Sequence, residues 1–435
     1  MRARQLSGPS KAGAVALLVA VAVTGCGRKD KEEPAAGSTA TAAAAGKGVS
    51  AGPATGEITV WALGAEGEKL EQIAADFQTK NTGAKVKVTV IPFDAAHDKI
   101  STAIAGKQTP DVSLVGTTWL AEFAATGALD ATPTDLIKPD RFFKGSWDTT
   151  DVKGTSYGVP WYTETRLIYY RKDLAEKAGV TPKAGWSQDD FKAFTKAMQA
   201  KGGAKWGISL QPGGKGSWQT MMPFAWQKGA NLAQGEKFTF NTPEMQSALD
   251  YYASFFTEKI SPTDLAQGAL ETGFIKGDIG AFVSGPWHMG ILKDQGGADF
   301  ADKWALAPMP KDKEGTSFTG GGDLVVFKNS KNRDAAWKFV DFLTQDAQQQ
   351  KLYDLVGSLP AVQSTWQSGK LASDPLLKTF GEQLKQAKSA PAVATWEEVA
   401  APLDDAIEQV SLGKAKPDAA LKQAEDKANG IGFGG

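Results

Sequence analysis

The sequence predicts an α/β protein of two domains, and two observations support this prediction. Segments with strand and helix patterns alternate as β-α-β-α-β over residues 57–116, an order typical of a mostly parallel sheet covered by helices. The chain has 435 residues, which is longer than a single domain usually is, and 42% of them are hydrophobic, which is enough for a large core. In such folds ligands bind where strands end and helices begin, so we expect the site in those loops.

Five short segments make up the alternation. Residues 57–63 (EITVWAL), 85–93 (KVKVTVIPF) and 110–116 (PDVSLVG) are rich in β-branched residues and predict strands. Residues 68–81 and 96–107 lie between them and carry apolar residues at helical spacing. The first and third loops of this unit therefore fall just after residues 63 and 116.

The remainder of the chain is expected to be mainly helical. Residues 187–305 are interpreted as helices, the first of which begins with a capping box of Ser187 and Asp190. Residues 323–330 predict a strand, and residues 332–356 predict one long amphipathic helix. A last helix is expected over residues 397–413.

Composition excludes several classes of function. Lys and Arg number 48 against 49 Asp and Glu, so the net charge of -1 argues against a nucleic-acid surface. The single cysteine, Cys26, allows neither an intramolecular disulfide nor a multi-cysteine metal site. The 13 tryptophans are unusual, since Trp is costly to bury completely and is favoured at binding sites.

The N-terminus reads as a targeting segment followed by a linker. Residues 1–25 combine a basic start with a short uncharged apolar stretch, which is typical of a secretory signal peptide. The next residue is Cys26, and the preceding Val-Thr-Gly resembles a bacterial lipobox, so we expect lipid attachment at this thiol. Residues 26–56 are poor in large apolar residues and are expected to form a disordered tether. We therefore expect the protein to be extracytoplasmic and lipid-anchored to the outer face of the cell membrane.

Four segments together resemble a known family. They are GVPWYTETRLIYYRKDLAEKAG (158–179), FIKGDIGAFVSGPWHMG (274–290), GGGDLVVFKNSKNRDAAWKFVDFLT (320–344) and GSLPA (357–361). In this order they resemble the extracellular solute-binding proteins of ABC sugar importers, family 1, of the maltose- and trehalose-binding type. Each segment alone is a weak signal, but their order behind a lipobox and tether is specific.

The resemblance implies a two-lobed periplasmic-binding-protein fold of type II, with hinge-connected α/β lobes and a ligand cleft between them. By analogy the N-terminal lobe covers residues 57–163 and 307–344, and the C-terminal lobe covers 164–306 and 345–435. The implied function is capture of a disaccharide or oligosaccharide, with a lean toward an α-glucoside such as maltose, maltodextrin or trehalose. The implied partners are a membrane permease and an ATPase on separate chains. The protein would be a monomer that is not an enzyme and uses no cofactor or metal.

Sugar recognition needs flat aromatic rings for the C–H faces and planar polar groups for the hydroxyls. By the resemblance, Trp287 is the stacking residue, and Tyr162 and Glu164 reach the sugar. Two alternatives stay open for Arg166, which could hold the ligand or pair with Glu164.

Further candidates lie in the other loops of the two lobes. Glu66 matches an acid of the family in the first loop, with Glu68 as the alternative if the register slips. Trp119 follows the third strand, although the acid that relatives place just before this Trp is absent. Gly321, Gly322 and Asp323 match a loop where glycine lets the main chain approach the ligand. The sequence does not sort four other tryptophans between cleft and core: Trp161, Trp226, Trp366 and Trp396.

The pattern at Ala390, where many relatives carry an Arg before the proline, also departs from the family. Two alternative functions remain. The first is the same fold with a non-sugar solute, such as iron, phosphate, a polyamine or a peptide. The second is a secreted glycoside hydrolase, although neither His97 nor His288 lies in a catalytic motif and no pair of acids stands out.

Overall fold

The computed structural model describes residues 46–434. The predicted signal peptide, the lipid-attachment residue Cys26 and the tether as far as residue 45 lie outside the described residues. Within 46–434, each helix is either too short or too polar to cross a lipid bilayer.

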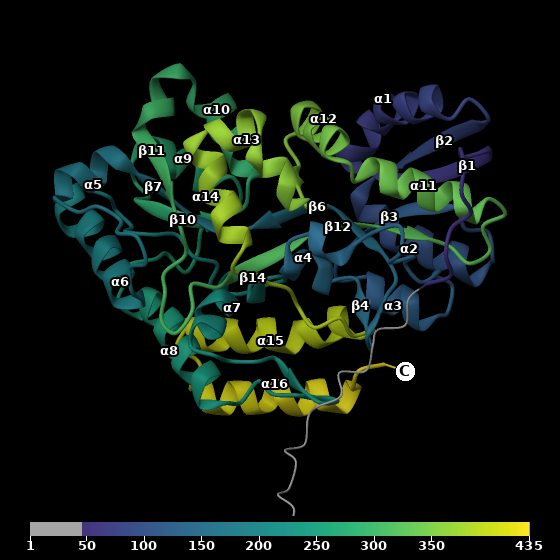
Figure 1. The fold of residues 1–435 in the computed structure, drawn as a ribbon. Helices are drawn as coiled ribbons and strands as arrows, with labels where there is room; N and C mark the ends of the chain where they lie inside the picture. Colours follow the sequence, from purple (N-terminus) through teal and green to yellow (C-terminus); the bar gives the residue numbers. More distant parts are fainter. Residues whose placement is uncertain (1–45, 435) are drawn as a thin grey trace, which may run out of the picture. The chain divides into compact units, whose positions relative to one another are not determined.

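A seven-stranded sheet forms the centre of the first lobe, in the order β13-β6-β12-β3-β1-β2 with β14 beside β12 (Figure 1). β1 runs parallel to β2 and β3, as the alternation predicts, but β12 runs antiparallel to β3 and β6. The sheet is therefore mixed rather than mostly parallel, because β12 returns from the second lobe in the opposite direction. The strands are β1 (Gly56–Leu63), β2 (Ala84–Ile91), β3 (Val112–Gly116), β6 (Val159–Thr165), β12 (Ser317–Val326), β13 (Leu359–Pro360) and β14 (Ala387–Lys388).

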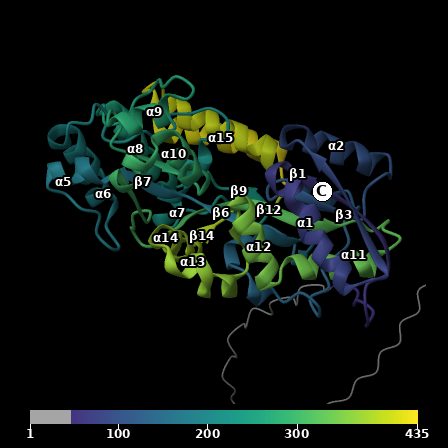
Figure 2. The same ribbon diagram turned by 90° about the horizontal axis from the view of Figure 1, so that it is seen from above.

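Helices cover this sheet and bury its apolar side chains. Helices α1 (Gly64–Lys80), α11 (Arg333–Leu343) and α12 (Asp346–Val356) contact one another and lie side by side in Figures 1 and 2. Helices α2 (Phe93–Ala105), α3 (Leu120–Ala125) and α4 (Lys144–Asp148) complete the unit, together with the hairpin β4 (Asp151–Val152) and β5 (Thr155–Ser156). Leu70 and Phe77 of α1 pack in one core with Phe339 of α11.

The second lobe contains a three-stranded antiparallel sheet in the order β10-β7-β11. Its strands are β7 (Leu167–Arg171), β10 (Ala281–Ser284) and β11 (Trp304–Ala307), and a separate hairpin comprises β8 (Ala233–Gln234) and β9 (Lys237–Phe238). The helices of this lobe are α5 (Lys172–Ala178), α6 (Gln188–Ala197), α7 (Trp218–Gln227), α8 (Pro243–Thr257), α9 (Ala269–Lys276), α10 (Trp287–Gly296), α13 (Gly369–Ser373), α14 (Pro375–Leu384), α15 (Trp396–Ser411) and α16 (Pro417–Ile431). The all-helical interpretation of residues 187–305 was wrong where β8 to β11 occur, because these strands are short.

The capping box at the start of α6 is confirmed. Ser187 accepts a hydrogen bond from the N–H of Asp190, and the Asp190 carboxylate accepts one from the N–H of Ser187. The single helix expected over residues 332–356 instead breaks into α11 and α12, because Thr344 and Gln345 leave the helical path. This break lets Leu352 of α12 pack into the core of the first lobe, and Lys351 pairs with Asp76 of α1 at 2.6 Å.

The chain crosses between the lobes where β6 gives way to β7, at Arg166, and again between β11 and β12. A third crossing follows β13, which pairs with β6 of the first sheet. Because α12 packs into the core of the first lobe and β13 pairs with β6, we propose that the N-terminal lobe extends through residue 362 rather than ending at 344. Residues 46–56 fall inside the segment expected to be a disordered tether, but they are ordered, because backbone groups there bond to the first lobe.

Candidate functional site

Strand β6 presents two of the candidate residues on one face. Tyr162 and Glu164 are partly exposed and alternate with the buried side chains of Trp161, Thr163 and Thr165. This is the two-residue period of a strand, which directs alternate side chains to opposite faces of the sheet. Tyr162 and Glu164 therefore lie on the same side of the first lobe, as their spacing predicts.

Two glycines of β12 let Tyr162 lie close to the sheet. A Cβ on Gly322 would be 2.6 Å from Cε1 of the Tyr162 ring, and one on Gly321 would be 2.3 Å from the Tyr162 carbonyl oxygen. Gly321 also has φ of +132°, a backbone conformation that residues other than glycine rarely adopt. Both glycines lie within a strand rather than in a loop, and the backbone that they approach is that of β6.

Three carboxylates affect the pKa of Tyr162. Burial raises the pKa of the Tyr162 hydroxyl well above its usual value, and the negative charges of Glu66, Glu164 and Asp323 raise it further. Glu66 stands in the first turn of α1, where an acid is favoured by the helix dipole, and accepts a 2.6 Å hydrogen bond from Ser358. The structure thus brings together four candidates from three separate segments of the chain.

Asp323 differs from the other two acids because it is completely buried. Both of its carboxylate oxygens face the hydroxyl of Thr149, at 3.2 and 3.0 Å. Burial raises the pKa of Asp323 to about 8, which the Thr149 hydrogen bond opposes only in part. Its side chain supports the sheet beneath Tyr162 and has no exposed atoms with which to touch a ligand.

Arg166 links the Tyr162 group to the second lobe. Its guanidinium donates to Glu164 at 3.1 Å and to Gln219 of α7 at 2.7 Å. The same group lies 4.8 Å from the ring centroids of both Trp287 and Phe318, so it is held between two aromatic faces. Of the two alternatives for Arg166, the structure contains the ion pair with Glu164.

Trp287 is the first residue of α10, and 43% of its surface is exposed. Its ring lies over Gly285, where an added Cβ would be 2.0 Å from Cζ3, so only glycine permits this placement. The Gly285 carbonyl accepts a 2.6 Å hydrogen bond from Tyr169, which fixes the turn from β10. The turn therefore holds an exposed indole ring at a defined position next to Arg166.

His288 has a structural environment rather than a catalytic one. Its ring nitrogens lie 2.7 Å from the Ser284 hydroxyl and 3.1 Å from a Glu271 oxygen. Burial lowers the pKa of His288, while Glu271 acts in the opposite direction. These bonds tie the start of α10 to β10 and α9.

A cavity of about 740 Å³ opens beside Trp287 in the second lobe. Arg166 and Trp287 line it, and the sequence analysis did not single out its other polar residues. Those residues include Lys215, Gln219, Glu397 and Asp405. Glu397 and Asp405 are eight residues apart on the polar face of α15, which helical periodicity could have identified; Lys215 and Gln219 belong to no motif.

The loop that forms one wall of this cavity is held by Asp404. Its carboxylate accepts hydrogen bonds from the N–H of Gly216 at 2.7 Å, from the Ser217 hydroxyl at 2.8 Å and from the N–H of Trp218 at 2.8 Å. Burial raises the pKa of Asp404, and the three bonds oppose this shift. The start of α7, and with it Gln219, is therefore fixed by a residue of α15.

Trp119 lies in a different group from Trp287. Its ring is 5.1 Å from that of the exposed Phe93 and 5.3 Å from that of His97, and it covers Gly116. His97 is partly exposed, and its ring nitrogen Nε2 lies 2.9 Å from an oxygen of Glu122. The structure does not place Trp119 on the wall of the cavity beside Trp287.

The unsorted tryptophans are mostly core residues. Trp161, Trp226 and Trp396 are 0%, 3% and 1% exposed. Trp366 is partly buried and donates to the Pro360 carbonyl at 3.0 Å. Among the described residues, none of the His, Cys, Asp and Glu side chains form a group of three or more that could hold a metal ion.

The chain resembles known proteins over most of its length. The profile of a family described as bacterial extracellular solute-binding protein matches residues 61–350. The solved structure of the sugar-binding protein MalE from Xanthomonas citri is 31% identical, with a TM-score of 0.80, over 86% of this chain and 97% of that one.

Two curated relatives are similar over comparable lengths. The diacetylchitobiose binding protein DasA of Streptomyces coelicolor is 28% identical over 88% of this chain and 92% of that protein. A maltooligosaccharide ABC transporter solute-binding lipoprotein of Streptococcus pneumoniae is 26% identical over 81% of this chain and 84% of that protein.

Proposed function

The chain belongs to the family of bacterial extracellular solute-binding proteins, and we propose that it is the substrate-binding component of an ABC carbohydrate importer. Its ligand is a disaccharide or a longer oligosaccharide, which it delivers to a membrane permease on a separate chain. The family and its relatives are binding proteins rather than enzymes, and the proposed role requires no chemical step.

The observation that supports this proposal most strongly is the placement of Trp287. An exposed indole stands beside a 740 Å³ cavity, with the guanidinium of Arg166 at 4.8 Å from its ring centroid. A sugar offers an apolar C–H face to such a ring and hydroxyls to the charged groups around it. The cavity volume lies within the range of sites that bury small organic ligands, which is about 300–1,000 Å³.

The polar groups near Trp287 suit hydroxyl recognition. Glu164, Arg166 and Gln219 form a hydrogen-bonded chain, and Glu397 and Asp405 line the same cavity as Arg166 and Gln219. Because carboxylates and guanidinium form strong, paired hydrogen bonds, they can read the hydroxyls at a ring's edge. We propose that Tyr162, Glu66 and Trp119 complete the contacts from the first lobe when the lobes close.

For the particular sugar, we propose an α-glucoside such as maltose, a maltodextrin or trehalose. The resemblance of the PWYTETR segment supports this choice, as does the relative named for maltooligosaccharides. Because another relative is named for diacetylchitobiose, this β-linked N-acetylglucosamine disaccharide is the sugar whose binding must be compared with that of the α-glucosides.

We also propose that the protein is anchored outside the cytoplasm by a lipid on Cys26. The Streptococcus pneumoniae relative is named a lipoprotein, which supports this proposal. Substitution Cys26→Ala should release the protein from the membrane fraction of producing cells, and retention of the variant in that fraction would contradict lipid attachment.

A thermal-shift panel tests the proposed ligand class. Maltose, maltotriose, trehalose and diacetylchitobiose are added at millimolar concentration, with sodium phosphate and spermidine as non-sugar solutes. A ligand that binds only the native state at about micromolar Kd adds roughly 4 kcal/mol at a thousandfold excess over Kd, which raises Tm by several degrees. A shift with phosphate or spermidine and with no sugar would replace the proposal by its non-sugar alternative.

A further inference from the structure

Residues 46–54, which we call the strap, run along the first lobe before β1 begins. The backbone N–H of Gly46 donates to the Thr132 carbonyl at 3.0 Å. The N–H of Ser50 donates to Asp334 at 2.9 Å, and the N–H of Ala54 donates to Asn81 at 2.8 Å. The strap is therefore held at its start, middle and end by specific hydrogen bonds.

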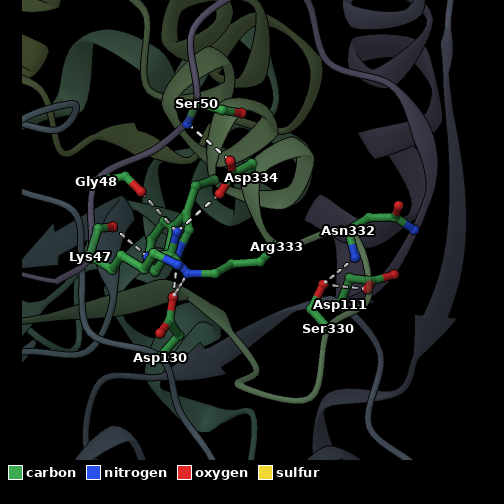
Figure 3. Close-up of polar contacts among 10 residues, drawn as sticks. Lys47, Gly48, Ser50, Asp111, Asp130, Ser330, Asn332, Arg333 and Asp334 are labelled. Atoms are coloured by element: carbon green, nitrogen blue, oxygen red, sulfur yellow. Dashed lines mark hydrogen bonds and ion pairs between the residues drawn. The ribbon is translucent and has the colours of Figure 1, made fainter.

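Arg333 of α11 is the main side chain that holds the strap (Figure 3). Its guanidinium donates to the carbonyls of Lys47 at 2.6 Å and Gly48 at 3.3 Å, while the same group pairs with Asp130 and Asp334 of the lobe. Charged donors form stronger hydrogen bonds than neutral ones. The guanidinium therefore bonds to the strap and to the lobe at the same time.

A second residue of α11, Trp337, holds the Asp130 carboxylate in place. The indole N–H of Trp337 donates to the Asp130 carboxylate at 2.8 Å. Trp337 is completely buried in the core of the first lobe, so the acid that orients Arg333 has a rigid support. The surface that receives the strap is consequently preformed by the lobe.

Close packing accompanies these bonds. Ala54 is only 1% exposed, and Val49 packs against the core of the first lobe. A Cβ on Gly46 would lie 2.0 Å from the Ala131 carbonyl oxygen, so the strap touches the lobe backbone there. The hydrogen bonds from Ser50, followed by the ion pair with Arg333, also lower the pKa of Asp334.

Within the described part of the chain, each hydrogen bond that the strap makes has its partner in the first lobe. The partners lie on or next to α1 and α11 and in the segment around residue 132. None of these elements lines the cavity beside Trp287, and Glu66, the α1 residue proposed to reach the ligand, lies at the opposite end of α1 from Asn81. Closing of the second lobe toward the first would leave all of these contacts in place.

We propose that the strap is a docking segment that fixes the linker to the first lobe, independently of whether the cleft holds ligand. The first lobe is then the held half of an anchored protein and the second lobe is the half that moves. This consequence rests on the proposed function, whereas the docking itself does not. A released strap would add nine residues to the linker, or up to roughly 30 Å of reach.

Hydrogen–deuterium exchange of the full chain tests the proposal, with one variant and a matched control. Gly46→Ala places a methyl group against the Ala131 backbone, so the start of the strap must lift off. In the control Gly48→Ala the nearest atom is a carboxylate oxygen of the Asp135 side chain at 3.1 Å, which can move aside. Neither change alters a residue of the lobe or of the cavity.

We expect the amides of Ser50 and Ala54 to exchange at least tenfold faster in Gly46→Ala than in the wild type or in Gly48→Ala. Saturating maltotriose should leave their exchange unchanged in the wild type. Fast exchange in the wild type, or equal exchange in the two variants, would overturn strap docking. A change in strap exchange on addition of sugar would overturn its independence from the cleft, while failure to bind any sugar would contradict only the proposed function.

Discussion

The indole of Trp287 is exposed, yet its position is fixed from two sides. Gly285 lets the ring lie against the turn, and the guanidinium of Arg166 stands between this ring and that of Phe318. An exposed aromatic ring that the protein holds in place loses little conformational entropy when a ligand stacks on it. We therefore expect this side chain to make a measurable contribution to the binding energy of the proposed ligand.

Substitution Trp287→Ala should weaken sugar binding by more than about 1 kcal/mol, or roughly fivefold or more in Kd, because the stacking surface is lost. Isothermal titration calorimetry measures the effect without depending on tryptophan fluorescence. Trp206→Ala is the matched control, since Trp206 is a partly buried Trp of the second lobe that does not line the cavity. Equal affinity of Trp287→Ala and the wild type would place the sugar elsewhere.

The buried carboxyl of Asp323 makes stability depend on pH. Its pKa is about 8 in the folded protein because of burial, against about 3.9 in an unfolded chain. Between these values the folded state holds a proton that the unfolded state has lost, so the free energy of unfolding falls as pH rises. The slope approaches about 1.4 kcal/mol per pH unit, and the contribution becomes constant above pH 8.

Substitution Asp323→Asn keeps an acceptor for Thr149 and removes the titration. We expect the variant to gain stability relative to the wild type as pH rises from 5 to 8.5, as measured by urea denaturation at both values. The same stability difference between variant and wild type at the two pH values would show that Asp323 titrates normally in the folded protein.

At the scale of elements, the pairing of β6 with β12 positions the Tyr162 group. Gly321 has a backbone conformation and a contact with the Tyr162 carbonyl that no other residue accommodates. We expect Gly321→Ala to reduce the free energy of unfolding by about 1–3 kcal/mol and to weaken sugar binding as well. Chemical denaturation and calorimetry measure the two effects.

Gly290→Ala in α10 is the control for this change. A Cβ at Gly290 would meet nothing within 4 Å, and alanine favours a helix interior by up to about 1 kcal/mol over glycine. Unchanged or increased stability is expected there. Were Gly321→Ala equally well tolerated, the close approach of the two strands would not be a constraint.

Helices and strands with a clear hydrophobic periodicity could be predicted from the sequence. Segments whose position depends on main-chain hydrogen bonds could not. The strands and helices of residues 57–116 alternate as expected, and the capping box of Ser187 and Asp190 is present. The break between α11 and α12 was missed because apolar residues continue at helical spacing through Thr344. The strap was missed because its bonds come from main-chain groups, which composition does not reveal.

The candidate site divides in the same manner. Segments that resemble the family suggested Trp287, Tyr162, Glu164 and Glu66 as candidates, and their role in ligand binding stays a prediction. Gln219 and Lys215 could not be predicted from the sequence, because only the folded chain brings the start of α7 to the cavity. Asp404 holds the start of α7 there. Asp323 could be located but not its complete burial, which depends on packing around β12.

At the scale of the whole molecule, we expect the two lobes to approach one another when sugar binds. The cavity beside Trp287 belongs to the second lobe, while Tyr162, Glu66 and Trp119 belong to the first. Ligand contacts with both lobes would favour a closed arrangement over an open one. Small-angle X-ray scattering should show a smaller radius of gyration in saturating sugar than in its absence.

The weaker-binding variant Trp287→Ala serves as the control for that measurement, at a sugar concentration that saturates the wild type. Trp287→Ala at the same sugar concentration should give the radius of gyration of the unliganded protein if its Kd exceeds that concentration. A radius of gyration that stays constant in the wild type despite bound sugar would mean that capture occurs without closure.

A crystal structure with the sugar that gives the largest thermal shift tests the central claim most directly. We expect a sugar ring stacked on Trp287, with hydroxyls bonded to Glu164, Arg166 or Gln219 and with first-lobe contacts from Tyr162 or Glu66. A sugar bound away from Trp287, or density for a non-sugar solute at this position, would contradict the proposed site.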